Sequence, residues 1–501
     1  MKIFSAEQMR AWDAYTIRHE PVLSIDLMER AAGRCADWLL AHFGQETGFM
    51  VFCGMGNNGG DGLAIARMLL AAGRRAGVVI LESRRQGSPD FLENLKRLQA
   101  ASGAIFLLAA GDAIPDVPAG AVVVDALFGT GLNTPLSGHA ARLVEHLNGL
   151  PNTRVAIDLP SGLFADRSAV GNPVLLATHT LTFAAPKLGL LLQENAPFTG
   201  EVHILDIGLS PAFESATETR FQLATATLVK SRFRPRNRFA HKGNFGHAYL
   251  AAGSLGKMGA ALMAATACLR GGAGLLSCHV PRCGVGILQT ALPEAMALPD
   301  PDETRLTTLP GETSRYNCAG IGPGIGTSTQ TAAMLRSCLA KFQVPFVLDA
   351  DALNLLAKDE SLMSLLPAGS ILTPHPKEFD RLFGAHDSDF DRIETALAAA
   401  ERLQSVVLLK GHHTFIASPT GSGYFNTTGN AGMAKGGSGD VLTGLLTALL
   451  AQGYGAEDAA LVGVWLHGKA GDLAVERQSY ESLLPGDLVA RLGAAFRQLY
   501  P

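Results

Sequence analysis

The sequence predicts an α/β protein with two domains of different design. Short apolar runs rich in Val, Ile and Leu alternate with helical patterns along the 501 residues, which is typical of parallel sheets covered by helices on both faces. A hydrophobic content of 47% is sufficient for large cores, whereas charged residues make up only 17%. The 56 glycines have no collagen period and gather in loops, which indicates many strand-to-helix turns.

Charge and cysteine content narrow the class of protein. The net charge of −4 gives no reason to expect nucleic acid or an anionic membrane as a partner. The 7 cysteines are an odd number and none forms a Cys-x-x-Cys pair, so we expect buried free thiols in a reducing compartment and no zinc. Glu7 and Asp13 come too early for a secretory signal, and no apolar run reaches membrane-spanning length. We therefore expect a soluble, cytoplasmic protein.

The first half begins with a helical segment, Ser5–Ala41, in which Ser5 and Gln8 resemble a capping box. Apolar runs then alternate with helical patterns at Gly48–Cys53, Gly77–Leu81, Ala121–Leu127, Arg154–Leu159, Thr178–Phe183 and Glu201–Ile207. We expect these runs to form one parallel sheet in a domain that spans residues 1–212. Residues 213–240 are the expected linker. The basic run from Lys230 to Lys242 is typical of a solvated linker, with a phosphate-facing rim of the second domain as the alternative.

A second alternating series occupies residues 241–501. The expected strands are Gly246–Ala252, Gly274–Val280, Asn317–Ile321, Pro345–Asp349, Ser370–Thr373, Val406–Lys410 and His413–Ala417. The expected helices are Gly259–Gly271, Thr329–Phe342, Arg392–Gln404, Asp440–Gln452 and Ala456–Glu476.

The stretch Asn430–Leu445 carries the strongest chemical signal. Its glycines precede an apolar helical run, and such a loop directs free amide N–H groups and the positive end of the helix dipole at one point, which suits a phosphate. Asp440 would repel a phosphate, unless it accepts the proton of an attacking hydroxyl while the amides hold the phosphoryl group. The alternative is an aspartate that only caps a helix.

Four further segments of the second half follow predicted strands. Ala252–Ala260 and Gly322–Gly326 each open a helix, although either could be only a tight turn. His375 lies between Pro374 and Pro376, where a ligand role and a structural role stay open, and Lys410 begins a Lys-Gly-His-His-Thr segment that could neutralise phosphate. Because doubly wound sheets gather such loops at strand carboxyl ends, we expect one pocket for a nucleotide and a second substrate.

The first half has its own glycine-rich loop, Gly54–Gly62, which contains two Asn and one Asp. Such a loop can cradle phosphate, and its side-chain oxygens suit a hard cation; a plain turn is the alternative. Asp125 follows the apolar residues Ala121–Val124, Asp158 follows Arg154–Ile157, and Lys187 comes shortly after Thr180–Phe183. Acids at strand ends belong at the ligand crevice rather than in the core, although each could also be a helix cap.

In order along the chain, the second-half motifs Gly253-Ser, Gly322-Pro-Gly, Thr373-Pro-His-Pro, Lys410-Gly and Gly-Gly-Ser-Gly-Asp440 resemble the ribokinase-like superfamily, and more closely its ADP/ATP-dependent NAD(P)H-hydrate dehydratase branch. The first-half loop Gly-Met-Gly-Asn-Asn-Gly-Gly-Asp-Gly and Leu27-Met-Glu-Arg-Ala-Ala-Gly33 resemble the NAD(P)H-hydrate epimerase domain. The resemblance implies an N-terminal Rossmann-like three-layer α/β/α domain and a C-terminal ribokinase-like α/β domain. Lys377 and Lys435 depart from the family pattern.

The resemblance also implies site residues. In the dehydratase domain, Asp440 would be catalytic, the hydrated nucleotide would contact Ala260, Gly322, His375 and Asp440, and ADP would contact Lys410, Gly411, His412, His413, Thr414 and Gly439. In the epimerase domain, Asp158 would be catalytic, with Lys187 a weaker candidate that could equally form a structural ion pair. The hydrated nucleotide would contact Asn57, Asn58, Gly59, Gly60, Asp61, Gly129, Thr130, Gly131, Leu132, Asn133, Thr134, Pro135 and Asp158, and K⁺ would be bound by Asn58, Asp125 and Ser161.

The implied function is repair of hydrated NADH and NADPH, by epimerisation of the R and S forms and ADP-dependent dehydration of the S form. We expect K⁺ in the epimerase domain, Mg²⁺ in the dehydratase domain, NAD(P)H hydrate and ADP as small-molecule substrates, and a homo-oligomer without nucleic acid or membrane partners. ADP is expected because fused bacterial forms usually use it. The alternatives are a small-alcohol kinase for a vitamin precursor or sugar, and a first domain that only binds ligands.

Overall fold

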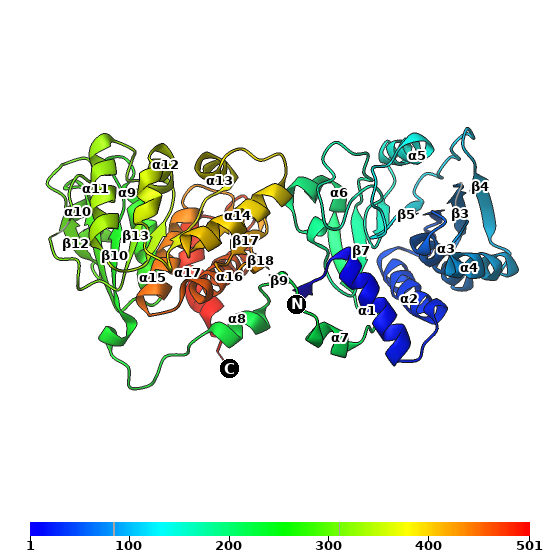
Figure 1. Ribbon diagram of the computed structural model, residues 1–501, viewed down its shortest axis with the longest axis horizontal. Helices are drawn as coiled ribbons and strands as arrows, with labels where there is room; N and C mark the ends of the chain where they lie inside the picture. Colours follow the sequence, from blue (N-terminus) through cyan, green and yellow to red (C-terminus); the bar gives the residue numbers. More distant parts are fainter. Residues whose placement is uncertain (84–85, 310, 501) are drawn as a thin grey trace. The chain divides into compact units, whose positions relative to one another are not determined.

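The computed structural model describes residues 1–83, 86–309 and 311–500 (Figure 1). The chain divides into two compact units. The N-terminal unit comprises Lys2–Thr219 with Ser388–Phe390, and the C-terminal unit comprises Arg220–Asp387 with Asp391–Pro501. The division falls inside the expected linker, 213–240. That stretch contains ordered elements, because the last residues of α7 (Pro211–Ala216), β9 (Phe221–Leu223) and α8 (Ala226–Arg232) lie within it. The domain boundaries expected from the sequence stay a prediction.

The N-terminal unit contains one parallel sheet in the order β4-β3-β2-β5-β6-β7-β8. Its strands are β2 (Phe49–Cys53), β3 (Ala76–Leu81), β4 (Ala104–Leu108), β5 (Val122–Ala126), β6 (Arg154–Ile157), β7 (His179–Phe183) and β8 (Glu201–Leu205). The chain runs outward from β2 to β4 and then returns to the other side of β2 at β5. This reversal between β2 and β5 is the switch point at which doubly wound sheets bind ligands.

Helices cover both faces of this sheet (Figure 1). They are α1 (Ala6–His19), α2 (Ser24–His42), α3 (Asn57–Ala71), α4 (Pro89–Ala100), α5 (Gly138–Asn148) and the short α6 (Ala196–Thr199). Alternate residues of β2 belong to different cores: Val51 packs with α2, α3 and α4, whereas Phe52 packs with α5. The continuous apolar runs in the sequence therefore reflect strands that are buried on both faces.

Two details of the N-terminal unit differ from the expectation. The segment Ser5–Ala41 forms two helices rather than one, because Pro21 prevents α1 from continuing past Glu20. The capping box of Ser5 and Gln8 is confirmed. Strand β4 was not expected, because its apolar run directly follows the apolar positions of α4 and the two cannot be separated by periodicity.

The C-terminal unit contains a mixed sheet in which β9-β18-β17-β16-β15-β14-β13-β10-β11-β12 follow one another. The strands after β9 are β10 (His247–Ala251), β11 (Leu275–Val280), β12 (Met296–Pro299), β13 (Cys318–Ile321), β14 (Phe346–Leu348), β15 (Ile371–Leu372), β16 (Val406–Leu409), β17 (Thr414–Ala417) and β18 (Gly423–Asn426). The strand order reverses between β10 and β13, which is the switch point of this sheet. Strands β9, β12 and β18 are additional to those expected.

The helices of the C-terminal unit form two layers. They are α9 (Met258–Arg270), α10 (Gly284–Ala291), α11 (Thr329–Lys341), α12 (Asp351–Lys358), α13 (Pro376–Phe383), α14 (Asp389–Leu403), α15 (Ser438–Ala451), α16 (Ala456–Val475) and α17 (Pro485–Arg497). Leu250 of β10 packs with α9, α15 and α16, whereas its neighbour Tyr249 packs with α11 and α12. The α/β class predicted from the sequence is therefore confirmed.

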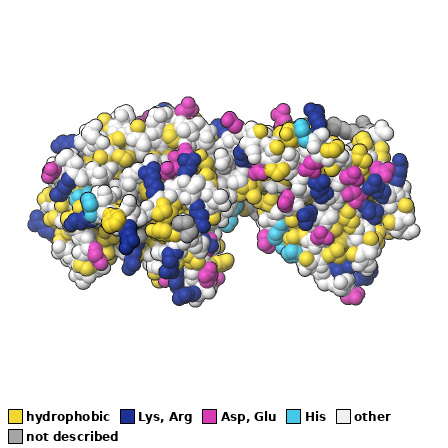
Figure 2. Space-filling model, turned by 90° about the horizontal axis from the view of Figure 1, so that it is seen from below, with side chains coloured by type: hydrophobic (Ala, Val, Ile, Leu, Met, Phe, Trp, Pro, Cys, Tyr) yellow, Lys and Arg dark blue, Asp and Glu magenta, His cyan; other side chains and the backbone are white. Residues whose placement is uncertain are grey.

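Charged side chains on the surface seen in Figure 2 are interspersed with hydrophobic ones. Among the described residues, no helix combines the length and the apolar character needed to cross a membrane.

We predict that Gly444→Ala destabilises the C-terminal unit, because α15 and α9 approach each other closely at this glycine. A Cβ atom at residue 444 would lie 1.9 Å from the Ala264 carbonyl oxygen, so the helices must move apart. Overpacking of this kind costs about 1–3 kcal/mol of unfolding free energy. The matched control is Gly493→Ala in α17, where a Cβ meets nothing within 4 Å and the helix gains up to about 1 kcal/mol. Urea unfolding of both variants measures the difference, and an unchanged midpoint for Gly444→Ala would contradict the prediction.

Candidate active sites at the carboxyl ends of the two sheets

The loop Gly54–Gly62 lies at the switch point of the N-terminal unit, between β2 and α3. Its glycines permit close backbone approach, since a Cβ on Gly59 would lie 1.7 Å from the Gly54 carbonyl oxygen. Asn57 and Asn58 are the first residues of α3, where free amide groups gather. The loop therefore presents amides and two side-chain amides at the edge where the sheet order reverses.

Asp158 directly follows β6 and has φ of +66°, a left-handed conformation that is uncommon for a residue other than glycine. Its Oδ1 lies 2.8 Å from Nζ of Lys187, and its Oδ2 accepts a hydrogen bond from the Thr130 amide at 3.1 Å. Burial is the largest influence and opposes ionisation of Asp158, but the Lys187 ammonium and the Thr130 hydrogen bonds together lower its pKa. Asp158 is therefore an ionised carboxylate held in a strained backbone position.

Lys187 is almost fully buried, with 1% of its side chain exposed. Besides Asp158 it donates to the Thr182 hydroxyl at 2.8 Å and to the Phe183 carbonyl at 2.9 Å. All three contacts lie at the carboxyl end of β7 or next to it. A buried ammonium with three oxygen partners holds the Asp158 carboxylate in one orientation.

Two more acids surround this pair. Burial and the charge of Asp158 raise the pKa of Asp61 well above its ordinary value. Burial, again with the charge of Asp158, raises the pKa of Asp13 to about 6, although Lys187 opposes this. Asp13 lies on α1, far from the glycine loop in sequence, and was not predicted as a site residue. Its raised pKa places a proton donor or acceptor near Asp158 at neutral pH.

Asp125 lies within β5, inside the expected apolar run Ala121–Leu127, and its side chain is fully buried. Its carboxylate accepts hydrogen bonds from the Ser161 hydroxyl at 2.6 Å, the Ser161 amide at 2.8 Å and the Leu127 amide at 3.2 Å. Burial raises the pKa of Asp125 to about 6. These partners are neutral donors, so a bound cation would favour the ionised form of the carboxylate.

Asn58 and Asp158 meet at Gly129. A Cβ on Gly129 would lie 2.9 Å from Oδ2 of Asp158 and 3.2 Å from Cγ of Asn58, which leaves room only for glycine. The buried Nδ2 of Asn58 has no hydrogen-bond partner among the described residues. An unsatisfied buried donor beside an ionised carboxylate indicates a place for a ligand oxygen. From Gly131 to Pro135 the loop is largely exposed.

In the C-terminal unit, α15 begins after a glycine turn in which Gly437 has φ of +102°. Asp440 lies in the first turn of this helix and is half-buried. Burial and the neighbouring charge of Asp349 raise the pKa of Asp440 to about 6, with Lys410 opposing. Asp440 is thus poised to exchange a proton close to neutral pH, next to the free amides of a helix N-terminus.

Asp349 follows β14 and was not predicted as a site residue. Its Oδ1 lies 2.7 Å from Nζ of Lys410, and its Oδ2 accepts a hydrogen bond from the Thr443 hydroxyl at 2.7 Å. Burial is the largest influence and opposes its ionisation, but Lys410 and the hydrogen bonds from Thr443 and Thr373 together lower the pKa of Asp349. A Cβ on Gly439 would lie 3.6 Å from both Asp349 Oδ2 and Lys410 Nζ. The Lys–Asp pair therefore lies directly against the glycine turn.

The two other glycine loops meet at the switch point between β10 and β13. The Gly253 amide donates to the Pro323 carbonyl at 2.8 Å, and a Cβ on Gly324 would lie 3.2 Å from that of Ala260. Gly322 has φ of +139°, and a Cβ there would lie 1.8 Å from the Asp349 carbonyl oxygen. Gly322 is therefore held beside Asp349, and Ala260 beside the same loop.

His375 is the N-cap of α13, and its Nδ1 accepts hydrogen bonds from the amides of Lys377 at 3.1 Å and Glu378 at 3.3 Å. Burial, together with Lys410, lowers its pKa, and its Nε2 lies 3.5 Å from Oε1 of Glu378. The adjacent Lys410 amide donates to the Pro374 carbonyl at 2.9 Å. Of the segment Lys410–Thr414, the lysine turns inward to Asp349, whereas His412 is exposed.

His467 of α16 was not predicted as a site residue. Its Nε2 donates to the Ser438 carbonyl at 2.9 Å, and burial lowers its pKa to about 4. A neutral imidazole therefore fixes the first residue of α15 from behind the glycine turn. The two lysines that depart from the family pattern lie elsewhere: Lys377 is exposed, and Lys435 donates to the Glu481 carbonyl.

Comparison with known proteins identifies the family. A bifunctional NAD(P)H-hydrate repair enzyme Nnr from Moorella thermoacetica is 37% identical over 515 residues, covering 100% of this chain and 97% of the relative. This chain belongs to the bifunctional NAD(P)H-hydrate repair enzyme family. The repair enzyme Nnr of Escherichia coli is 34% identical over 470 residues, covering 93% of this chain and 88% of the relative.

Two family models match the two halves of the repair enzyme in which the two sets of glycine motifs lie. The pattern of the YjeF-related protein N-terminus matches residues 24–189, and that of NAD(P)H-hydrate dehydratase matches residues 248–492. Among solved structures, a ribokinase-like superfamily protein from Enterococcus faecalis matches with a TM-score of 0.50 and 26% identity, covering 56% of this chain and 98% of that one. The family and the ribokinase-like C-terminal fold expected from the sequence are confirmed.

Proposed function

We propose that this chain repairs hydrated NADH and NADPH. The N-terminal unit would exchange the R and S epimers of the hydrate, and the C-terminal unit would dehydrate the S epimer with ADP as phosphoryl donor. The names of its full-length relatives support both activities. The position of Asp440, an acid with a pKa of about 6 at the N-terminus of α15, carries the proposal for the C-terminal unit.

Dehydration must remove a hydroxyl group, and hydroxide is a poor leaving group. Asp440 would accept the proton of the ring hydroxyl while the hydroxyl oxygen attacks the β-phosphorus of ADP. This step forms a phosphate ester on the ring and releases AMP. Electron donation from the ring nitrogen would then break the carbon–oxygen bond and expel phosphate. Loss of a ring proton completes NAD(P)H. The amides of Gly437 to Gly439 are suitably placed to stabilise the charge on the moving phosphoryl group.

Mg²⁺ fits the donor set beside Asp440. The charge of Asp351 contributes to the raised pKa of Asp440, so two carboxylates share one region, and Mg²⁺ prefers such oxygen ligands together with substrate phosphates. When bound, the ion would neutralise charge on the phosphate oxygens. Besides this ion, the chain itself would supply the positive charge of Lys410, which its contact with Asp349 holds beside the glycine turn.

Epimerisation inverts the carbon that carries the hydroxyl group, so a bond at that carbon must open and re-form with proton transfer. Asp158 would act as the base, because the Lys187 pair keeps its carboxylate ionised and fixed. Asn58, with its unsatisfied buried donor, would hold an oxygen of the substrate.

K⁺ fits the group of Asn58, Asp125 and Ser161, because a fully buried carboxylate with neutral partners favours a neighbouring cation. A bound K⁺ would supply positive charge that keeps Asp125 ionised and draws oxygen atoms of the substrate to the loop Gly54–Gly62.

We also keep the expectations of a homo-oligomer and a cytoplasmic location as proposals.

The decisive assay follows the recovery of NADH absorbance from hydrated NADH in the presence of ADP and Mg²⁺. We expect recovery with both epimers, and faster turnover with ADP than with ATP. A small-alcohol kinase would leave the absorbance unchanged and release a stable phosphate ester. Supplying the R epimer alone tests the N-terminal unit, because a first domain that only binds ligands would leave this epimer to its spontaneous exchange rate.

We predict that Asp440→Asn lowers kcat for dehydration about 10²–10⁴-fold while nucleotide binding survives, because only the proton acceptor is lost. The wild-type rate should fall below about pH 6, as protonation of Asp440 removes the base, and this acid limb should vanish in the variant. Asp359→Asn is the control, since that exposed acid pairs with Arg336 away from the glycine turn. Near-normal turnover of Asp440→Asn would exclude the proposed base.

We predict that Asp158→Ala and Asp158→Asn block R-to-S exchange and leave dehydration of the S epimer intact. The asparagine variant retains a hydrogen-bond acceptor for Lys187, so it separates loss of the base from loss of folding. Chromatography of the two epimers measures the exchange rate, with Asp206→Asn as an exposed control in the same unit. Unchanged exchange in both Asp158 variants would refute the role of Asp158.

A further inference from the structure

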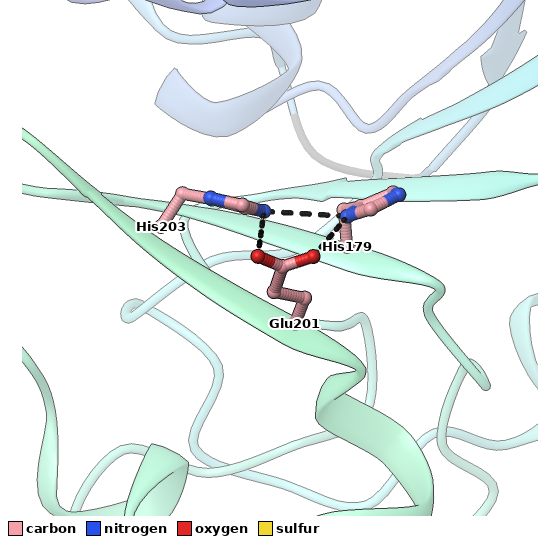
Figure 3. Close-up of side chains that lie close together, drawn as sticks. All are labelled: His179, Glu201 and His203. Carbon is pink, nitrogen blue, oxygen red and sulfur yellow. Dashed lines mark hydrogen bonds and ion pairs between the residues drawn. The ribbon is translucent and has the colours of Figure 1, made fainter. Parts of the chain in front are cut away.

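Three side chains meet on one face of the last two strands of the N-terminal sheet. In the register of the parallel pair, His179 of β7 lies opposite Glu201 of β8, and Leu181 lies opposite His203. Residues two apart on a strand share a face, so His203 and Glu201 point to the same side as His179. Figure 3 shows the three side chains turned toward one another.

The spacing of their ligand atoms is that of a small coordination shell. Nδ1 of His179 and Nε2 of His203 are 3.2 Å apart, and the Glu201 oxygens lie 3.7 and 3.9 Å from these nitrogens. Zinc–nitrogen bonds of about 2.0–2.1 Å in a tetrahedron put two ligand atoms about 3.4 Å apart. Glu201 is largely exposed and free to close the remaining few tenths of an ångström.

We propose that His179, Glu201 and His203 bind a divalent transition-metal ion, with Zn²⁺ the best fit to two imidazoles and one carboxylate. The fourth position would be left to water. No Cys-x-x-Cys pattern is involved, which is why the cysteine content led to an expectation of no zinc.

This cluster is separate from the candidate active site of the same unit. His179 and Glu201 are the first residues of β7 and β8, at the amino end of the sheet. Asp158 and Lys187 lie beyond the opposite, carboxyl ends of β6 and β7. The ion would therefore not contact the substrate of the epimerase, and its role would be to tether β8 to β7.

The surroundings hold the two imidazole rings in place. The Trp38 ring lies against both histidines, with ring centroids 5.1 and 4.8 Å apart, and restricts their orientation. Two rings held in place before an ion arrives lose little freedom on binding it.

The experiment uses the full-length protein, stripped with a chelator and dialysed against buffered Zn²⁺. Metal content is measured for the wild type, for His179→Gln with His203→Gln, and for Glu201→Gln. His19→Gln is the control, because His19 is a histidine of the same unit that lies outside the cluster. His19 stacks on the Tyr15 ring and its Nδ1 contacts the Tyr15 carbonyl, in the same way that His42, next to the cluster, contacts Trp38.

We expect the wild type and His19→Gln to bind one Zn²⁺ ion that the double variant does not bind. Glu201→Gln should raise the Kd more than about tenfold, because a ligand is lost. Zn²⁺ should also raise the thermal midpoint of the N-terminal unit in the wild type and in His19→Gln, but not in the double variant. Retained epimer exchange shows that the variants are folded. Equal zinc content in the double variant, or none in the wild type, would overturn the proposal and leave only a hydrogen bond between two imidazoles.

Discussion

A buried carboxylate at the end of a parallel strand is unstable unless a cation lies beside it, and both units of this chain meet that requirement with a lysine. Asp158 pairs with Lys187 and Asp349 pairs with Lys410, at 2.8 and 2.7 Å. In each case a hydroxyl also bonds the pair: Thr182 accepts from Lys187, and Thr443 donates to Asp349. The backbone has positive φ at Asp158 itself and at Ala350, the residue that follows Asp349. Strain of this kind persists only where surrounding contacts fix it, so the ion pairs define the shape of both sites.

The fold and the glycine loops could be predicted because their signals are local. Apolar runs identify strands buried on both faces, and glycine is required at Gly59, where a side chain would collide with the backbone, and at the Gly437 turn, where φ is positive. Asp158 was found because it ends an apolar run. Asp125 lies inside the expected apolar run Ala121–Leu127, and its residue pairs with β2 and β6 show that the strand continues through it.

The rest of the sites depends on contacts between residues that are far apart in sequence. In the sequence, Asp13 resembles any charged residue of a surface helix. Only the packing of α1 brings it close enough to Asp158 for that charge to raise its pKa. His467 lies 29 residues from Ser438 and resembles any buried histidine of a long helix. Asp349 is a different case: it ends a predicted strand, as Asp158 does, so the rule that found one could have found the other. Only the contact with Lys410 shows why it belongs to the site.

The two ends of the N-terminal sheet face different physical demands. At the carboxyl end, loops must hold charges and an unsatisfied amide for a ligand, and they do so by strain and ion pairing. At the amino end, β8 is the last strand of its sheet and, among the described residues, pairs with β7 alone, so its outer edge has no ladder there. A bridge between side chains of β7 and β8 stabilises the pairing where hydrogen bonding is one-sided. The His–Glu–His cluster thus belongs to the stability of the sheet that supports Asp158, and it can change without altering the chemistry at the other end.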